Sequence, residues 1–225
     1  ITGGSRSGIY CLGASPTISH CIIEGNSGVY VGDFTVQGGG IYCQNSSPVI
    51  DTCIINDNSC TMSDWGAGAY GGGLYADGTS GPFVNNCVFE YNNCNAHGVM
   101  GSDALGGAIC ADGSVNIKVV NCVIKKNSTV ADDVDVYGLS SGGGLYGCDG
   151  IISNCTIVGN TVSSGGYASS GGGGLAWCNG VITNCIIWGN TAEGSGDNLS
   201  SSSTPTYSCI QDWGSGAGNI SSDPL

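Results

Sequence analysis

The segment GGGLYGCDGIISNCTIVGN, residues 142–160, recurs in closely similar form as GGGLAWCNGVITNCIIWGN at residues 172–190. Both copies contain the pattern Cys-x-Ile-x-x-Asn, and four earlier segments contain it with isoleucine or phenylalanine at the third position. Successive units are 30 to 36 residues apart, which is the signature of a repeat architecture. The cysteines of the six full units are Cys21, Cys53, Cys87, Cys122, Cys155 and Cys185, and the asparagines are Asn26, Asn58, Asn92, Asn127, Asn160 and Asn190.

Each unit has the alternation of a β-strand. Cys155 and Ile157 alternate with Thr156 and Val158, so the two pairs of side chains point to opposite faces. The cysteine and the isoleucine or phenylalanine recur in every full unit, whereas the position of Val158 varies widely in character. The sequence therefore predicts one constant apolar face, turned inward, and one variable face, turned outward.

A strand of about five residues cannot bury its apolar face alone, so the units must stack on one another at about 4.8 Å. Leucine-rich repeats, propeller blades and hexapeptide helices each need a different period or residue frame. We therefore predict an all-β fold, a right-handed parallel β-helix of about seven coils. Residues 1–225 form a single domain, with a degenerate last coil and a C-terminal tail at 191–225. The first residues lack the pattern of a signal peptide, so we expect a segment of a longer precursor.

Stacking turns each recurring position into a column along the axis. Four columns are expected to fill the interior: the aliphatic residue after the glycines, the aliphatic residue three positions before the cysteine, the cysteine, and the isoleucine or phenylalanine. The asparagines of the repeat are expected to form a structural ladder. A second set directly precedes the cysteines and is expected at bends in left-handed conformation, bonding to the backbone and to the amide of the next coil: Asn86, Asn121, Asn154 and Asn184. Glycine triplets such as 142–144 are expected at sharp turns.

The chain has 14 cysteines, seven of which belong to the inward column when Cys209 is included. We expect most of these seven to be buried free thiols, because parallel stacking points neighbouring Cβ atoms the same way and strains a disulfide. Three further pairs occupy matching positions of neighbouring units, namely Cys11 with Cys43, Cys60 with Cys94, and Cys148 with Cys178, which leaves Cys110 over. Cys60 and Cys94 lie in variable segments and are the best disulfide candidates.

The motifs GGAI at 106–109 and FEYN at 89–92 resemble those of the chlamydial polymorphic outer-membrane proteins. The longer unit GGGIYCQNSSPVIDTCIINDN resembles bacterial secreted and surface β-helix repeat proteins, and SCIQDWGSGAGNISSDPL at 208–225 is similar to their closing segment. The resemblance implies a right-handed β-helix at the cell surface or outside the cell, with roles in surface display, adhesion or polysaccharide contact.

Charge limits the partners. The chain has 4 Lys and Arg against 17 Asp and Glu, a formal charge of -13, so it lacks the cationic cluster that nucleic acid requires. No apolar run is long enough to span a membrane.

Parallel β-helices are also the scaffold of pectate lyases and polygalacturonases, but this chain lacks their chemistry. Arg6 lies at the extreme start, and no pair of aspartates on a core strand accompanies a histidine. The densest carboxylate cluster contains Asp132, Asp133 and Asp135, which could supply oxygen ligands to calcium. A solvated acidic loop is the alternative that we favour, and we expect no cofactor to be required.

Nearly all variation in length follows the ladder asparagine, so these segments are expected to be loops on one face of the rod. Their aromatic and acidic residues could stack on sugars or bind a protein, or they could cover one another. This candidate partner or glycan face contains Tyr30, Phe34, Asp64, Trp65, Tyr70 and Tyr137.

We therefore hypothesise a non-enzymatic, extracellular structural or adhesive rod. Unpaired strands at the ends of a β-helix would let copies stack end to end into a filament. The alternative is a polysaccharide-binding or polysaccharide-cleaving, pectate-lyase-like protein. The partner is then either a second copy or a glycan or protein at the cell surface.

Overall fold

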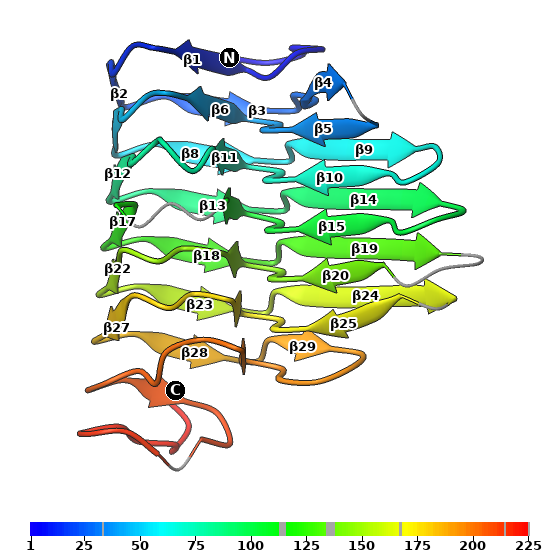
Figure 1. The fold of residues 1–225 in the computed structure, drawn as a ribbon. Coiled ribbons are helices and arrows are strands. Elements are labelled where there is room, and N and C mark those ends of the chain that lie inside the picture. The colour runs from blue at the N-terminus through cyan, green and yellow to red at the C-terminus, as the bar shows by residue number, and fades with distance from the viewer. Residues whose placement is uncertain (33, 113–115, 134–137, 167, 214, 225) are drawn as a thin grey trace.

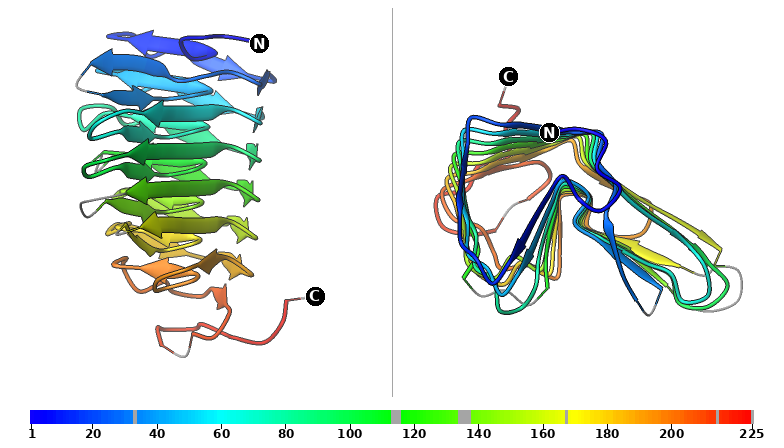
Figure 2. Two further views of the ribbon diagram at one scale, coloured as in Figure 1. Left: turned by 90° about the vertical axis from the view of Figure 1, so that its right-hand side faces the viewer. Right: turned by 90° about the horizontal axis from the view of Figure 1, so that it is seen from above.

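The computed structural model describes residues 1–32, 34–112, 116–133, 138–166, 168–213 and 215–224. Every regular element in these ranges is a β-strand, and none of their residues is helical. The strands stack coil upon coil from the N-terminal to the C-terminal end (Figure 1). Seen along the axis, the coils superimpose as a closed body with an arm projecting from one side (Figure 2).

Three parallel sheets form the body. Sheet S1 contains, in spatial order, β1 (Ile9–Leu12), β6 (Ile41–Gln44), β11 (Leu74–Ala76), β16 (Ile109–Ala111), β21 (Leu145–Tyr146), β26 (Leu175–Ala176) and β30 (Leu199–Ser200). Sheet S2 contains β2 (Thr17–Ser19), β7 (Val49–Asp51), β12 (Phe83–Asn85), β17 (Lys118–Val120), β22 (Ile151–Ser153) and β27 (Val181–Thr183). Sheet S3 contains β3 (Ile22–Glu24), β8 (Ile54–Asn56), β13 (Val88–Glu90), β18 (Val123–Lys125), β23 (Thr156–Val158), β28 (Ile186–Trp188) and β31 (Cys209–Ile210).

Two further sheets form the arm. Sheet S4 contains β9 (Ser59–Ser63), β14 (Asn93–Gly98), β19 (Ser128–Asp133), β24 (Thr161–Gly166) and β29 (Thr191–Ala192). Sheet S5 contains β4 (Val29–Gly32), β5 (Thr35–Gln37), β10 (Gly68–Tyr70), β15 (Asp103–Leu105), β20 (Leu139–Ser141) and β25 (Ser169–Gly171). Among these strands, only β4 pairs antiparallel, with β5.

The four inward columns predicted from the repeat fill the body. In its third coil, Leu74, Val84, Cys87 and Phe89 are all at most 1 % exposed. The corresponding residues of the other coils belong to the same core cluster. Identical positions lie in register, as with Phe89 between Ile55 and Ile124. The predicted fold class is confirmed, but the predicted number of about seven coils is slightly too high, because only two of the five sheets have seven strands and one has five.

The asparagines of the repeat form a buried hydrogen-bonded ladder along the axis. Asn58 donates its Nδ2 to Asn92 Oδ1 at 3.0 Å, and Asn92 donates in turn to Asn127 Oδ1 at 2.9 Å. The backbone N–H of each of these two residues donates to the same oxygen of the next coil. These hydrogen bonds satisfy the buried backbone N–H groups and amide side chains at the turn where the chain passes from S3 into S4.

The second set of asparagines takes the predicted left-handed conformation, with φ of 53° to 55° at Asn86, Asn121, Asn154 and Asn184. The prediction that these amides bond to one another is wrong for the two bonds that the structure shows. Asn86 Nδ2 donates to Asp51 Oδ1 at 3.4 Å, and Asn121 Nδ2 donates to Asn85 Oδ1 at 3.1 Å. In both bonds the acceptor belongs to the preceding coil and lies one position before the residue that is equivalent to the asparagine. The left-handed turn points the asparagine side chain outward, away from the equivalent side chain of that coil.

The prediction of loops in the variable segments is wrong. Most of each segment forms paired strands of S4 and S5, whose facing sides bury a small core separate from that of the body. This core is built mainly from small side chains, including Cys60, Ala69, Cys94 and Ala104. Small residues are needed because the two sheets of the arm approach closely.

Candidate binding surfaces on the arm and the body

The free end of the arm presents exposed aromatic and apolar side chains at successive turns. Phe34 lies between β4 and β5, Trp65 between β9 and β10, and Met100 between β14 and β15; they are 42 %, 60 % and 46 % exposed. Asp64 is exposed beside Trp65 and accepts a hydrogen bond from the Trp65 backbone N–H at 2.8 Å. We call Phe34, Asp64, Trp65 and Met100 the arm tip; the arm projects from one side of the body in Figure 2.

The residues predicted from the sequence to form one partner or glycan face lie in different places in the structure. Tyr30 is 58 % exposed on β4, the outermost strand of S5, and Phe34, Asp64 and Trp65 lie at the arm tip. Tyr70 does not belong to this face, because it points into the junction between arm and body, where it stacks on Tyr75. Tyr137 lies outside the described residues. Met100 was missed, although it occupies the turn equivalent to that of Trp65.

The candidate calcium residues do not converge. Asp132 pairs with His97, with 2.9 Å between His97 Nδ1 and Asp132 Oδ2, and both side chains are about half exposed. Asp133 is buried, and both of its carboxylate oxygens accept the backbone N–H of Ser102. The two aspartates are adjacent in β19, so their side chains point to opposite faces of the strand. Asp135 lies outside the described residues, and no cluster of three or more potential ligands forms elsewhere in the described ranges.

The junction between S1 and S5 is packed with tyrosines. Tyr10, Tyr42 and Tyr75 stack in a column with ring centroids 4.9 and 5.5 Å apart, and Tyr42 and Tyr75 are buried. Tyr70 of S5 meets this column at 6.4 Å from Tyr75. A pocket of about 170 Å³ opens at the lower end of the stack, lined by Gln37, Tyr70, Tyr75, Leu105, Cys110, Asp112 and Tyr146.

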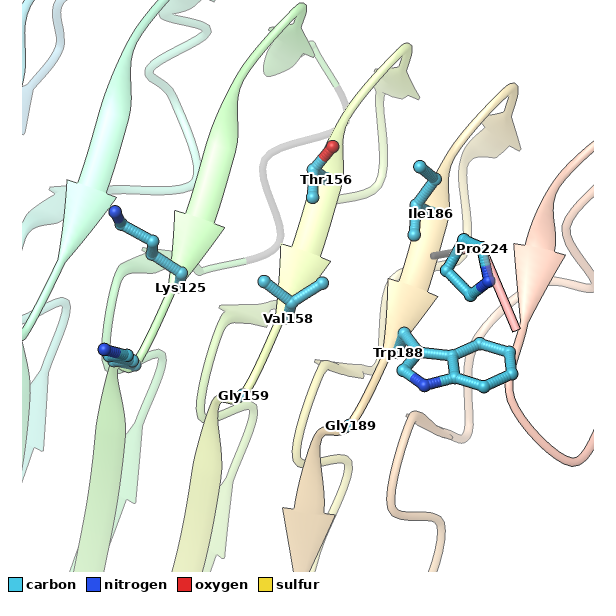
Figure 3. Close-up of a pocket in the computed structure, with 9 residues that line it drawn as sticks. Lys125, Thr156, Val158, Gly159, Ile186, Trp188, Gly189 and Pro224 are labelled. Atoms are coloured by element: carbon cyan, nitrogen blue, oxygen red, sulfur yellow. The ribbon is translucent and has the colours of Figure 1, made fainter.

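A second pocket, of about 450 Å³, lies on the outer face of S3 (Figure 3). Its floor includes Val158 and Trp188, which are in register on β23 and β28, and Pro224 closes it from the C-terminal tail. Lys125 stands at its other end, where its Nζ pairs with Glu90 Oε2 at 2.9 Å. The described lining residues include no carboxylate, histidine or thiol, and apart from the amines of Lys125 and Lys126 they offer a surface for packing.

All 14 cysteines are free thiols. Cys60 and Cys94, predicted as a disulfide in variable loops, are instead fully buried and in register on β9 and β14 inside the arm. Neighbouring thiols of the body column hydrogen-bond to one another, and these contacts together with burial raise the pKa of Cys155 to about 12, against a partial lowering by Cys185. These residues act as small core side chains rather than as nucleophiles.

No helix in the described part of the chain is long and apolar enough to cross a bilayer. Comparison with curated proteins and comparison with solved structures gave no significant match. A family model does match, over residues 1–212, which include the body and the arm. The chain therefore belongs to the family of the right handed beta helix region.

Proposed function

We propose that this chain is a non-enzymatic β-helix rod that binds an extracellular glycan through the arm tip. Membership of the family supports a structural or polysaccharide-related role in general. The observation that favours binding at the arm tip is the exposure of Trp65 and Met100 at equivalent turns between S4 and S5, with Phe34 exposed in the β4–β5 hairpin of the preceding coil. No ring contact joins Phe34 to Trp65 among the described residues, and both side chains are exposed to solvent.

A row of exposed rings suits sugars because the apolar face of a pyranose packs on an aromatic ring while neighbouring acceptors bind its hydroxyls. Asp64 supplies such an acceptor next to Trp65. The spacing of coils, about 4.8 Å, brings successive turns close enough for one glycan chain to contact several of them. The role we propose needs no cofactor.

The test is binding of the purified protein to a panel of insoluble polysaccharides, compared with the double variant Phe34→Ala/Trp65→Ala. Loss of two ring contacts should weaken binding by about tenfold or more. The matched control is Trp177→Ala, since Trp177 is 48 % exposed on the body, next to β26. Equal binding by the wild type and the double variant, with unchanged thermal stability, would rule out the arm tip as the site.

Cleavage of polysaccharide is less well supported than binding. A glycosidase needs two carboxyl groups flanking the scissile bond, about 5 to 10 Å apart. The junction pocket has Asp112 as the one carboxylate among its described lining residues, and the pocket on S3 has none. Absence of new reducing ends after incubation with a bound polysaccharide is the expected result.

Our second proposal is that copies of the rod stack end to end into a filament. It is favoured by the parallel sheets, whose outer strands carry unpaired backbone groups. Against it, residues of the chain itself partly cover these strands: Thr2 bridges to β3, β4 folds back on β5, and Ile220 bridges to β31. Electron microscopy of concentrated protein distinguishes filaments from separate rods.

A further inference from the structure

The tyrosine column of S1 lacks one ring. The register aligns Tyr42, Tyr75, Cys110 and Tyr146 on consecutive strands β6, β11, β16 and β21. The rings above the interruption stack closely, with centroids 5.5 Å apart between Tyr42 and Tyr75. A thiol in place of a phenol therefore leaves a gap of one ring between Tyr75 and Tyr146.

The gap coincides with the junction pocket. Tyr75 and Tyr146 are two strands apart, which corresponds to about 9.6 Å along the axis. Tyr70 and Leu105 of S5 close the side of the gap that faces the arm, and Cys110 forms its floor. The pocket of about 170 Å³ is thus bounded by three tyrosines and is partly open to solvent.

The electrostatic potential of the gap favours a cation. Asp112 follows β16 directly, at the level of the missing ring, and its Oδ2 accepts a hydrogen bond from Tyr75 Oη at 3.4 Å. Burial, together with nearby groups that include Asp103 and Asp112, raises the pKa of Tyr146 to about 12. No lysine or arginine occurs among the described lining residues, and the chain carries a formal charge of -13.

The shape of the gap selects the kind of cation. A guest midway between Tyr75 and Tyr146 lies about 4.8 Å from each ring, within the distance of about 6 Å at which a cation interacts with an aromatic ring. One carboxylate and a thiol make a poor site for a metal ion, and no cluster of three or more ligands is found in the described residues. A methylated ammonium has both the positive charge that suits Asp112 and the apolar surface that suits the rings and Leu105.

We propose that the gap between Tyr75 and Tyr146 is a binding site for a quaternary ammonium group. Such groups are recognised by aromatic residues that surround the charge, with a carboxylate nearby. The group could belong to a free small molecule such as choline or to a trimethylated lysine in a partner protein, and both share this chemistry.

Isothermal titration calorimetry with choline and with 3,3-dimethylbutan-1-ol, its uncharged isostere, tests the proposal. Choline should bind at least about tenfold more tightly, because the isostere loses the interaction with the rings and with Asp112. Phosphocholine should bind more weakly than choline, since its phosphate approaches an acidic protein. A trimethyllysine peptide, compared with its unmethylated form, distinguishes a protein ligand from a free one. Equal affinity for choline and its isostere, or no binding of any quaternary ammonium probe, would overturn the proposal.

Four variants locate the site. Cys110→Tyr should complete the column and abolish choline binding, and Asp112→Asn should weaken it by about tenfold while preserving the shape of the pocket. Tyr146→Leu should weaken binding, whereas Tyr146→Phe, which keeps the ring, should retain it. Because Cys110→Tyr could perturb the fold, the two Tyr146 variants test independently whether choline binding needs an aromatic ring at this position. Phe34→Ala/Trp65→Ala should bind choline normally, so failure of the arm-tip proposal would leave this one intact. Full choline binding by Tyr146→Leu and Asp112→Asn would refute the location.

Discussion

Each buried asparagine of the ladder serves several backbone groups at once. Asn127 Oδ1 accepts both the backbone N–H and the Nδ2 of Asn92, at 3.0 and 2.9 Å. Its own Nδ2 donates to Asn160 Oδ1 at 2.9 Å and to the Phe89 carbonyl at 3.1 Å. A single amide side chain therefore connects three coils at a fully buried position.

Replacing Asn127 by alanine should destabilise the protein by about 3 kcal/mol, because at least two donors of Asn92 lose their acceptor in a buried site. The exposed Asn121, with φ of 55°, provides the control. Asn121→Gly keeps the left-handed turn and should cost less than about 1 kcal/mol. Urea denaturation measures both, and equal losses for the two variants would argue against the ladder as a principal support.

The thiol column makes the fold sensitive to alkali. The hydrogen bond to Cys122 and burial raise the pKa of Cys155 from 9.0 to about 12. The unfolded chain then releases this proton at lower pH than the folded chain, so stability falls as the pH rises from about 9 to 12. Each such thiol should lower the free energy of unfolding by about 1.4 kcal/mol per pH unit within this window.

Urea denaturation at pH 7.5 and at pH 10.5 tests this dependence. The variant Cys155→Ala should show a shallower decline with pH than the wild type, although it is less stable at pH 7.5. A decline that is identical in both proteins would assign the effect to other groups, such as Tyr146.

At the scale of the elements, the turns between arm and body depend on close approach of backbones. The second glycine of each triplet lies against the neighbouring coil: a Cβ at Gly143 would stand 2.5 Å from the Thr161 carbonyl oxygen and 2.7 Å from that of Gly173. The first glycine, Gly142, has φ of 64°. The triplet therefore combines a left-handed turn with a contact that excludes any side chain.

Gly143→Ala should destabilise the protein by about 3 kcal/mol, because rigid backbone atoms on both sides would have to move. Gly25→Ala is the matched control: its φ is 61°, but nothing lies within 4 Å of its Cβ position. This variant should cost only about 1 kcal/mol, for the left-handed conformation. Thermal unfolding followed by circular dichroism compares the two, and similar losses would mean that conformation rather than contact sets the cost.

The arm shows why sequence reasoning succeeded for one group of elements and failed for another. The body strands carry long aliphatic residues at fixed spacing, which made S1, S2 and S3 predictable. The arm strands use small residues such as Cys94 and Ala96, alternating with polar ones, within segments of variable length. The alternation with a period of two is present in the sequence. The segments were nevertheless predicted as loops, because small and polar residues are also typical of loops.

At the scale of the whole molecule, the excess of negative charge opposes compactness. The formal charge is -13, and the described residues form one ion pair between Lys125 and Glu90, besides the contact of His97 with Asp132. Most carboxylates therefore repel one another across a rod of modest size. Salt screens this repulsion over a Debye length of about 10 Å at 0.1 M.

Raising NaCl from about 10 to 300 mM should increase the melting temperature by about 3 °C. KCl should give the same increase, since screening depends on ionic strength and not on the identity of the cation. CaCl2 at matched ionic strength should give no larger increase either, because Asp132 and Asp133 point to opposite faces of β19. A larger increase in calcium would show that the protein binds this ion specifically, and a decrease of the melting temperature in NaCl would contradict the role of repulsion.

The repeat pattern alone specifies which residues stack. In a solenoid, equal positions in the repeat become neighbours in space, so the period of the cysteines and asparagines specified the core columns, the ladder and the direction of the strands. The two features that bear on binding depend instead on how the chain packs in three dimensions. A variable segment forms strands and not a loop because its S4 strand packs against the S5 strands on the other side of the arm. These strands come from a different part of the coil, so the pattern within the S4 segment does not reveal them. The gap at Cys110 likewise exists only because Tyr75 and Tyr146 lie above and below it and S5 closes its side. The sequence shows that Cys110 has no matching cysteine in a neighbouring unit. It does not show that Cys110 replaces a tyrosine in a stacked column, because that column forms only when the coils pack on one another.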